Sequence, residues 1–269
     1  MNDGRTTAWW GEHRIEHGQA ARVRVGPLIL TAARLDNEWR LCRDSSGDSS
    51  DMSHGVEVPI EPPELGRTAR ASRFGCSNGS EKLELLPILP DRPVVTRPEQ
   101  PITVPPHEQV TVYVGSPLWV RVSDAEHKQT LEELPAFRPS LTWFGPNTRE
   151  GQLCYGTRTY GRLRLAEVVH YPHRVMTAVS INNGGDKPLL LERLLLPVQR
   201  FSVYATASGE LWTESATLER EPGEELATLQ LGTKPPGQAA GAKQVSKPRE
   251  TSSQKLLFHA FGSLFKGRG

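Results

Sequence analysis

The sequence predicts an all-β protein: an antiparallel β-sandwich, either one large sandwich or two small ones, with a C-terminal amphipathic helix. About a dozen short apolar segments alternate with turn residues, and the 269 residues include 24 Gly and 22 Pro. Short strands separated by such turns are typical of sandwiches and barrels. A helical pattern is convincing only at the end of the chain. We therefore expect an all-β body at 1–231, with possible halves at 1–125 and 136–231, a flexible linker at 232–252 and a basic amphipathic helix at 253–269.

The first strands are separated by turns and by a polar loop. Asp36 and Asn37 have the chemistry of a turn, and Pro62-Pro63 ends the strand before it. Residues 44–55 are rich in Ser, Asp and Gly and cannot pack a core, so we expect a loop there. The predicted strands of this region are 21–25, 28–35, 38–43 and 56–60.

Alternation of apolar and polar residues is clear between residues 102 and 114. Val110, Val112 and Val114 alternate with Thr111 and Tyr113, which is the period of a half-buried strand. The Pro-Pro pair before this segment marks a turn, because proline cannot donate a ladder hydrogen bond. We expect a further strand at 118–122 and one or two helical turns at 128–134.

The strongest β signal lies towards the C-terminus. Residues 175–181 lead into the turn sequence Asn-Asn-Gly-Gly-Asp at 182–186, and an apolar segment follows at 189–196. Asn and Gly accept the positive φ angles that tight hairpins need, so this pattern predicts a β-hairpin. The segments 201–207 and 210–219 repeat the pattern around Ser208-Gly209.

Cysteine content and the first residues favour a cytoplasmic location. Three widely spaced cysteines, at 42, 76 and 154, fit neither a disulfide framework nor a zinc motif. Residues 1–18 are polar and lack the apolar region of a signal peptide. No segment approaches the roughly 18 apolar residues of a membrane span. We expect reduced thiols in the cytoplasm, with a membrane-peripheral location left open.

The near-neutral total charge conceals an asymmetry. The formal net charge of the chain is +1, yet from Lys234 onward there are seven basic residues and one acidic residue. The body is therefore acidic and the tail is basic. An anionic partner would be expected to meet the tail.

The end of the chain has the pattern of an amphipathic helix. Two apolar rows with a spacing of four residues fall on one side of it, and lysines lie outside that side. Burial of this face contributes about 8–15 kcal/mol, which ordering a dozen residues offsets, so the helix needs a cover. The cover could be the protein's own body, a protein partner or second copy, or an anionic membrane surface. The predicted contact residues are Lys255, Leu256, Leu257, Phe261, Leu264, Phe265 and Lys266.

Two histidine motifs have partial similarity to metal sites. His13 and His17 match H-x-x-E-H, but that chemistry needs both on one face of a long helix, and glycines bracket this short segment. His170 and His173 lack thiolates or carboxylates nearby at ligand spacing. We favour ordinary hydrogen-bonded or exposed histidines, and we assign no metal ligands and no cofactor.

Other candidate chemistry is also weaker than its structural alternative. The aspartates of the 44–55 loop lack the closing Glu of a calcium loop. Arg67, Arg70 and Arg73 could contact phosphate, but stacking aromatics are sparse, so we expect no nucleic acid. Cys154 is more consistent with a buried thiol than with a nucleophile. The P-loop, dinucleotide-binding and nucleophile-elbow motifs are missing from the sequence, and we assign no catalytic residue.

Aromatic residues cluster in the middle of the chain. Most of them should pack in the core or on a sheet face. The alternative is a cleft near Trp143–Tyr160, lined by Trp143, Tyr155 or Tyr160, in a small-ligand or carbohydrate-binding protein or a hydrolase.

Two stretches resemble a known family. They are ITVPPHEQVTVYVGSPLWVRV at 102–122 and LTWFGPNTREGQLCYGTRTYGRLRL at 141–165, and the similarity continues through 175–211. The steps Phe144-Gly145-Pro146 and Gly151 to Cys154-Tyr155 carry most of it. The chain resembles the prokaryotic family called domain of unknown function 432, over about residues 9–220. The resemblance implies a bacterial or archaeal origin and no activity, and it leaves out the tail from residue 232.

The sequence therefore predicts a non-catalytic interaction module. Its partner would be a protein or a second copy bound through the C-terminal helix, or an anionic membrane surface. The small-ligand or carbohydrate-binding protein remains the alternative.

Overall fold

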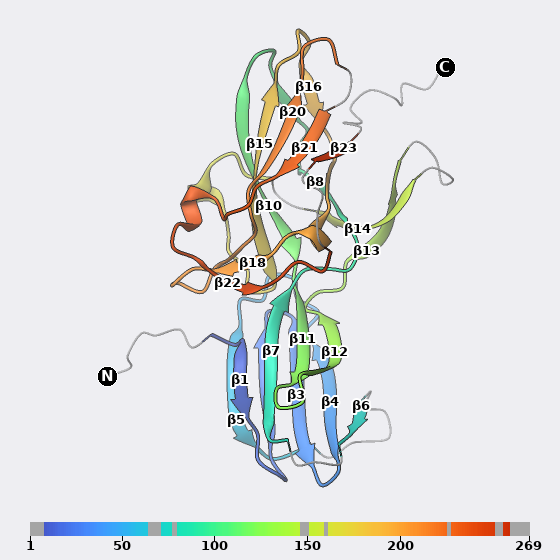
Figure 1. Ribbon diagram of the computed structural model, residues 1–269, viewed down its shortest axis with the longest axis vertical. Helices are drawn as coiled ribbons and strands as arrows, with labels where there is room; N and C mark the ends of the chain where they lie inside the picture. Colours follow the sequence, from blue (N-terminus) through green and yellow to red (C-terminus); the bar gives the residue numbers. More distant parts are fainter. Residues whose placement is uncertain are drawn as a thin grey trace. The chain divides into compact units, whose positions relative to one another are not determined.

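The computed structural model describes residues 8–63, 71–76, 80–145, 151–158, 161–224, 227–250 and 255–258 (Figure 1). The secondary structure of these residues is almost entirely β, with short 3-10 helices, so the predicted all-β class is confirmed. No helix among them has the length and apolarity needed to cross a membrane.

The chain forms two compact units that are interleaved in sequence. The N-terminal unit comprises Met1–Ile88, Leu118–Arg138 and Tyr171–His173, and the C-terminal unit comprises Leu89–Pro117, Pro139–His170 and Arg174–Gly269. The halves expected from the sequence, 1–125 and 136–231, are each one continuous stretch of chain. The two units differ from them because 118–138 adds strands to the N-terminal unit, whereas 89–117 and 139–170 on either side of it belong to the C-terminal unit.

Antiparallel neighbours form two sheets among the described residues of the N-terminal unit. One sheet has the order β5-β2-β3-β4-β6 and the other β1-β7-β11-β12. The strands of the first are β2 (Ala20–Val25), β3 (Leu28–Leu35), β4 (Glu38–Ser45), β5 (His54–Ile60) and β6 (Ala71–Gly75). Those of the second are β1 (Gly11–Arg14), β7 (Lys82–Ile88), β11 (Trp119–Asp124) and β12 (Gln129–Pro135).

The core of this unit follows from the two-residue alternation of its strands. Val23 lies opposite Leu30 on neighbouring strands, and both are buried. Leu85 and Val122 form the same kind of buried pair in the other sheet. The helical turns predicted at 128–134 are wrong, because β12 is a strand paired with β11 along this segment. Pairing with an available sheet edge overrides the weak local preference.

The C-terminal unit is built around a large mixed sheet. Its order is β22-β18-β19-β15-β20-β21-β23, and β10 pairs with the other side of β15. Its strands are β10 (Gln109–Pro117), β15 (Arg174–Asn183), β18 (Val203–Ala205), β19 (Leu211–Trp212), β20 (Ala216–Arg220), β21 (Ala227–Leu231), β22 (Lys243–Ser246) and β23 (Lys255–Phe258).

Smaller strand groups complete this unit. One sheet has the order β13-β14-β8-β17, and β16 pairs with β9. The strands are β8 (Val94–Arg97), β9 (Ile102–Val104), β13 (Ser140–Phe144), β14 (Gln152–Arg158), β16 (Leu189–Leu191) and β17 (Leu194–Leu196). The 3-10 helices are η1 (Leu165–Glu167), η2 (Val198–Arg200) and η3 (Gly237–Ala239).

The two predicted hairpins have different outcomes. The hairpin around Ser208-Gly209 is confirmed, because β18 pairs with β19. The hairpin at 182–186 is wrong: β15 pairs with β10, whereas the segment after the turn pairs with β9 and β8. Buried Asn183 explains the divergence, since its Nδ2 donates to the carbonyl oxygens of Val104, Pro105 and Lys187. These bonds direct the chain into another strand pair.

The segment expected as a linker contains regular structure in its described part, 232–250. Strand β22 pairs with β18, and Ala239 is buried beside Tyr113 and Trp212. Gln238 Nε2 donates to the Tyr113 hydroxyl at 2.8 Å, and Arg249 Nε donates to the Leu89 carbonyl oxygen at 2.7 Å. Anchors of this kind hold a segment of low apolar content against the sheet.

The predicted C-terminal helix is wrong at 255–258. These residues form β23, antiparallel to β21, and no helix is seen in the described part of 253–269. A short helix has little stability of its own in water, whereas the open edge of β21 satisfies the backbone groups of an added strand. These four residues therefore lie on the protein's own body, which is one of the three expected covers. Residues 259–269 lie outside the described part of the chain.

Candidate functional site

The small sheet of the C-terminal unit ends at β13. The sequence Leu-Thr-Trp-Phe alternates, so successive side chains point to opposite faces. The hairpin register pairs Leu141 with Tyr155 and Trp143 with Leu153, which places these four side chains on one face. Thr142 pairs with Cys154 on the other face.

The inner face anchors the hairpin. Cys154 is fully buried with Val95 and Leu195, and Phe144 packs against this cluster. The Cys154 Sγ donates to the Gln152 carbonyl oxygen at 3.3 Å, and burial raises the pKa of the thiol to about 11. The expectation of a buried thiol is confirmed. Because the thiol stays protonated near neutral pH, it is a packing group.

The outer face is apolar and open to solvent. Leu141 is 59% exposed and Trp143 is 47% exposed. Among the residues whose burial is described, Trp143 is the exposed aromatic side chain, whereas Trp9, Trp39 and Trp212 are buried. Most aromatic residues of this region were expected in the core or on a sheet face, and Trp143 lies on a sheet face that is open to solvent.

Neighbouring polar contacts fix the base of this face. The Tyr155 hydroxyl donates to Asp91 Oδ1 at 2.9 Å. The Arg92 guanidinium carbon lies 5.9 Å from the centre of the Tyr155 ring, within the range of a cation–π contact. Of the three aromatics expected to line a cleft, Trp143 and Tyr155 share this solvent-facing side and Tyr160 lies outside the described residues.

Strand β13 is the outermost strand of its sheet and carries no charged side chain. In Figure 1, β13 and β14 form a hairpin that extends from the other strands of their unit. Natural edge strands are usually blocked by charged side chains, proline or bulges. The sequence of β13, Ser-Leu-Thr-Trp-Phe, has none of these on its exposed row. The charged edges elsewhere in the described residues are β1, β5, β6, β12, β22 and β23.

The other uncharged edge strands are covered or very short. Strand β10 is mostly buried, and Tyr113 exchanges backbone hydrogen bonds with Arg162 on its open side. All three side chains of β17 are buried. Strands β9 and β16 are three residues long, and each exposes only its central side chain.

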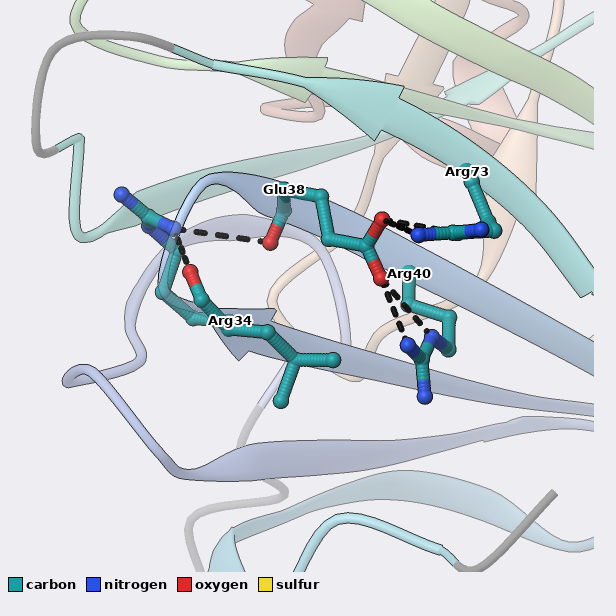
Figure 2. Close-up of polar contacts among 5 residues, drawn as sticks. Arg34, Glu38, Arg40 and Arg73 are labelled. Atoms are coloured by element: carbon teal, nitrogen blue, oxygen red, sulfur yellow. Dashed lines mark hydrogen bonds and ion pairs between the residues drawn. The ribbon is translucent and has the colours of Figure 1, made fainter.

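The most organised charged cluster lies on β4 and β6 of the N-terminal unit (Figure 2). Glu38 Oε1 accepts from Arg40, with Nη2 at 2.6 Å, and Oε2 accepts from Arg73 Nε at 2.7 Å. These bonds, chiefly the one from Arg73, lower the pKa of Glu38. Arg73 is therefore held by a carboxylate across the strand pair. Its predicted companions at 67 and 70 lie outside the described residues.

The candidate metal ligands do not converge. His13 lies in strand β1 with its Nε2 3.2 Å from the Trp9 carbonyl oxygen, and His17 pairs with Asp36. His170 Nε2 lies 3.7 Å from Glu210 Oε1. Within the described ranges, no three His, Cys, Asp or Glu side chains gather in a way that could hold a metal ion.

Aspartates in the 44–55 loop accept local hydrogen bonds that stabilise its turns. Asp48 Oδ1 accepts from the backbone N–H and hydroxyl of Ser50, at 2.8 and 2.7 Å. Asp51 Oδ1 accepts from the Ser53 N–H at 2.8 Å. These bonds lower the pKa of both carboxyl groups. Such local caps are the usual role of Asp in turns.

The predicted C-terminal contact residues fall into two groups. Lys255, Leu256 and Leu257 lie on β23, opposite Gln230, Leu229 and Thr228 of β21. The others, Phe261, Leu264, Phe265 and Lys266, lie outside the described residues. Strand β13 was not among the sites expected from the sequence, although its lack of charge between Arg138 and Arg149 is visible there.

The described residues thus form an all-β protein of two units, and among them β13 is an apolar sheet edge with exposed Leu141 and Trp143. Its chain belongs to the family described as protein of unknown function (DUF432), whose sequence model matches residues 9–266. This confirms the resemblance and extends it through the tail that the resemblance left out. Comparison with curated proteins gave no significant match, and comparison with solved structures gave none either.

Proposed function

We propose that this protein is a binding module that takes up a protein partner on the outer face and open edge of β13. The observation that supports this function is an uncharged edge strand that carries exposed Leu141 and Trp143. An extended segment can add to such an edge by backbone hydrogen bonds, while alternate side chains set specificity. Exposed Trp beside apolar neighbours is also the composition of interface centres.

The hairpin is suited to this role because its inner face is fixed. The inner face of the hairpin packs in the buried cluster around Cys154, and the Tyr155 hydroxyl on the outer face donates a hydrogen bond to Asp91. A preorganised edge loses little conformational entropy when a partner binds. The predicted contacts at Phe261, Leu264, Phe265 and Lys266 stay predictions, now without a helix at 255–258.

We infer that the N-terminal unit is a small sandwich. Its sheets each bury one row of side chains, such as Val23 in one and Val122 in the other. Arg43 of β4 and Glu132 of β12 form an ion pair at 3.7 Å between strands of different sheets. We also propose a cytoplasmic location, supported by cysteines that are all free.

Site-specific photo-crosslinking tests the function. A benzoylphenylalanine replaces Leu141 in the full chain, in cells that normally make the protein, and crosslinked products are identified by mass spectrometry. We expect one specific protein adduct, which is lost when Trp143→Glu is added. The matched control places the crosslinker at Leu163, which is 52% exposed in the same unit. Equal adducts at both positions, or none at 141, would contradict the proposal.

A second candidate uses the same face for a carbohydrate. The exposed indole of Trp143 on the side that carries Tyr155 favours it, because sugar rings stack on aromatic faces. Titration with a panel of oligosaccharides, followed by Trp fluorescence, tests this candidate. A saturable change that Trp143→Ala removes would support it. A flat response across the panel would leave the protein partner as the function.

A further inference from the structure

We infer that the occupant of β13 is the β13 of a second copy, paired antiparallel about a two-fold axis at Thr142. The sheet β13-β14-β8-β17 would then continue across two molecules. This inference rests on the proposed function and names its partner. The partner copy completes the site, since Leu141 of each copy covers Trp143 of the other.

The charges of the sheet edges favour a second copy. Edge strands β1, β6 and β12 carry Glu12, Arg73 and Glu132, which would oppose one another or face like charges in a self-pair. Residues 140–144 carry no charge. Two copies of β13 can therefore approach without placing like charges opposite each other. An uncharged strand also offers nothing that would select a charged partner segment.

The register follows from which side chains are exposed. In an antiparallel self-pair, a slip by one residue places Leu141 opposite a residue of the inner row, so the apolar rows fall on different faces. A slip by two residues leaves either Leu141 opposite Gly145 or Trp143 opposite Pro139. Only the register centred on Thr142 places Leu141 opposite Trp143 at both symmetry-related positions. Aromatic and aliphatic side chains are favourable cross-strand partners.

A two-fold pair of this kind is isologous and closed. Each copy uses the same edge, β13, which the contact leaves paired, so this contact joins two copies and does not extend further. The paired strand is five residues long, which limits the interface to a small area. We therefore expect a reversible dimer with a dissociation constant on the order of micromolar.

The test uses sedimentation velocity of the full chain over a concentration series, with paired charge variants. Wild type should shift from monomer to dimer as its concentration rises. The double variant L141E/W143E places like charges opposite each other twice and should weaken dimerisation at least about tenfold. The double variant L141E/W143K places Glu opposite Lys at the same positions. It should dimerise more tightly than L141E/W143E, with an affinity that falls as salt is added.

Leu163→Glu, at another exposed apolar position of the same unit, should dimerise like wild type. Circular dichroism of each variant checks that it is folded. The proposal is overturned by a wild type that stays monomeric to about 1 mM, or by equal dimerisation of the two double variants. A monomeric wild type that still gives a different protein adduct from position 141 refutes the second copy and leaves the proposed function standing. A monomer with no adduct refutes both.

Discussion

Strands β6 and β13 each end a sheet, but their side chains leave the two edges in different chemical states. On β6, Arg73 is bound to Glu38 of the neighbouring strand, so a charged and hydrated group stands at the edge. On β13, Leu141 and Trp143 occupy the exposed row. A second strand would have to remove water from the Arg73 ion pair to add to β6, whereas adding to β13 buries apolar surface.

The comparison separates two uses of the same fold element. Edges such as β6 end a sheet and resist further pairing, as most natural edges do. An edge without these protections is an aggregation hazard unless it has a partner. The contrast therefore supports the proposal that β13 is the binding strand, within a protein whose fold alone suggests no function.

The largest effect expected from this comparison concerns tryptophans on the two sheets. Trp39 lies on β4, the strand that pairs with the charged edge strand β6, and it is fully buried, whereas Trp143 is exposed. Trp39→Ala should lower the free energy of unfolding by about 3–5 kcal/mol, because it removes a large core side chain. Trp143→Ala should change it by less than about 0.5 kcal/mol, as expected of a surface position.

Urea denaturation at a protein concentration below the dimer range measures both changes. Far-ultraviolet circular dichroism reports the loss of strand structure. A Trp143→Ala protein as unstable as Trp39→Ala would mean that the exposed face is part of the core, and the comparison between the two edges would fail.

Much of the fold was predictable because it depends on local alternation. Val110, Val112 and Val114 identify β10, and Ser208-Gly209 identifies the turn of the β18–β19 hairpin. Strand pairing was less predictable. After β15, the side chain of Asn183 donates a hydrogen bond to the Val104 carbonyl oxygen, which is distant in sequence, and the next strand, β16, pairs with β9. Residues 255–258 were misassigned because Leu256 and Leu257 fit a helical pattern as well as a strand.

The candidate site could not be identified from the sequence alone. An alternating segment such as Leu141–Thr142–Trp143 reads as a strand, but the sequence does not say whether it lies inside or at the end of a sheet. Tertiary pairing decides this, through the parallel contact between β14 and β8 that leaves β13 outermost. The lack of charge was visible, but it is equally typical of a buried strand.

A third edge strand, β12, extends the comparison to pH. The hairpin between β11 and β12 is fixed by buried Asp124, which accepts hydrogen bonds from Ser80 Oγ at 2.7 Å and His127 Nδ1 at 3.0 Å. Burial opposes ionisation of Asp124, but the bonds from Ser80 and His127 outweigh it and lower the pKa. The stabilisation is therefore present above the unfolded pKa of about 3.9 and is lost as the pH falls through the folded value.

Asp124→Asn should lower the free energy of unfolding by about 1–3 kcal/mol at pH 7, because bonds to a buried carboxylate are lost. The difference from wild type should shrink below about pH 4, where the wild-type carboxyl group also becomes protonated. Urea denaturation between pH 3 and 7 measures it. A difference that stays constant over this range would mean that Asp124 stabilises the hairpin without its charge.

The smallest effect is local and tests what protects β6. Glu38→Gln removes the carboxylate that holds Arg73 but keeps the size of the side chain, so β6 should open more often without global unfolding. Hydrogen exchange should become several-fold faster at the β4–β6 amides of residues 71–75, while the amides of residues 140–144 stay as in wild type. Glu12→Gln, at the exposed edge strand β1, is the matched control and should leave both sets unchanged.

In wild type, protection of the β13 amides should rise with protein concentration and protection of the β6 amides should not, since only the uncharged edge gains a partner strand. Equal concentration dependence at the two edges would show that charge does not distinguish them.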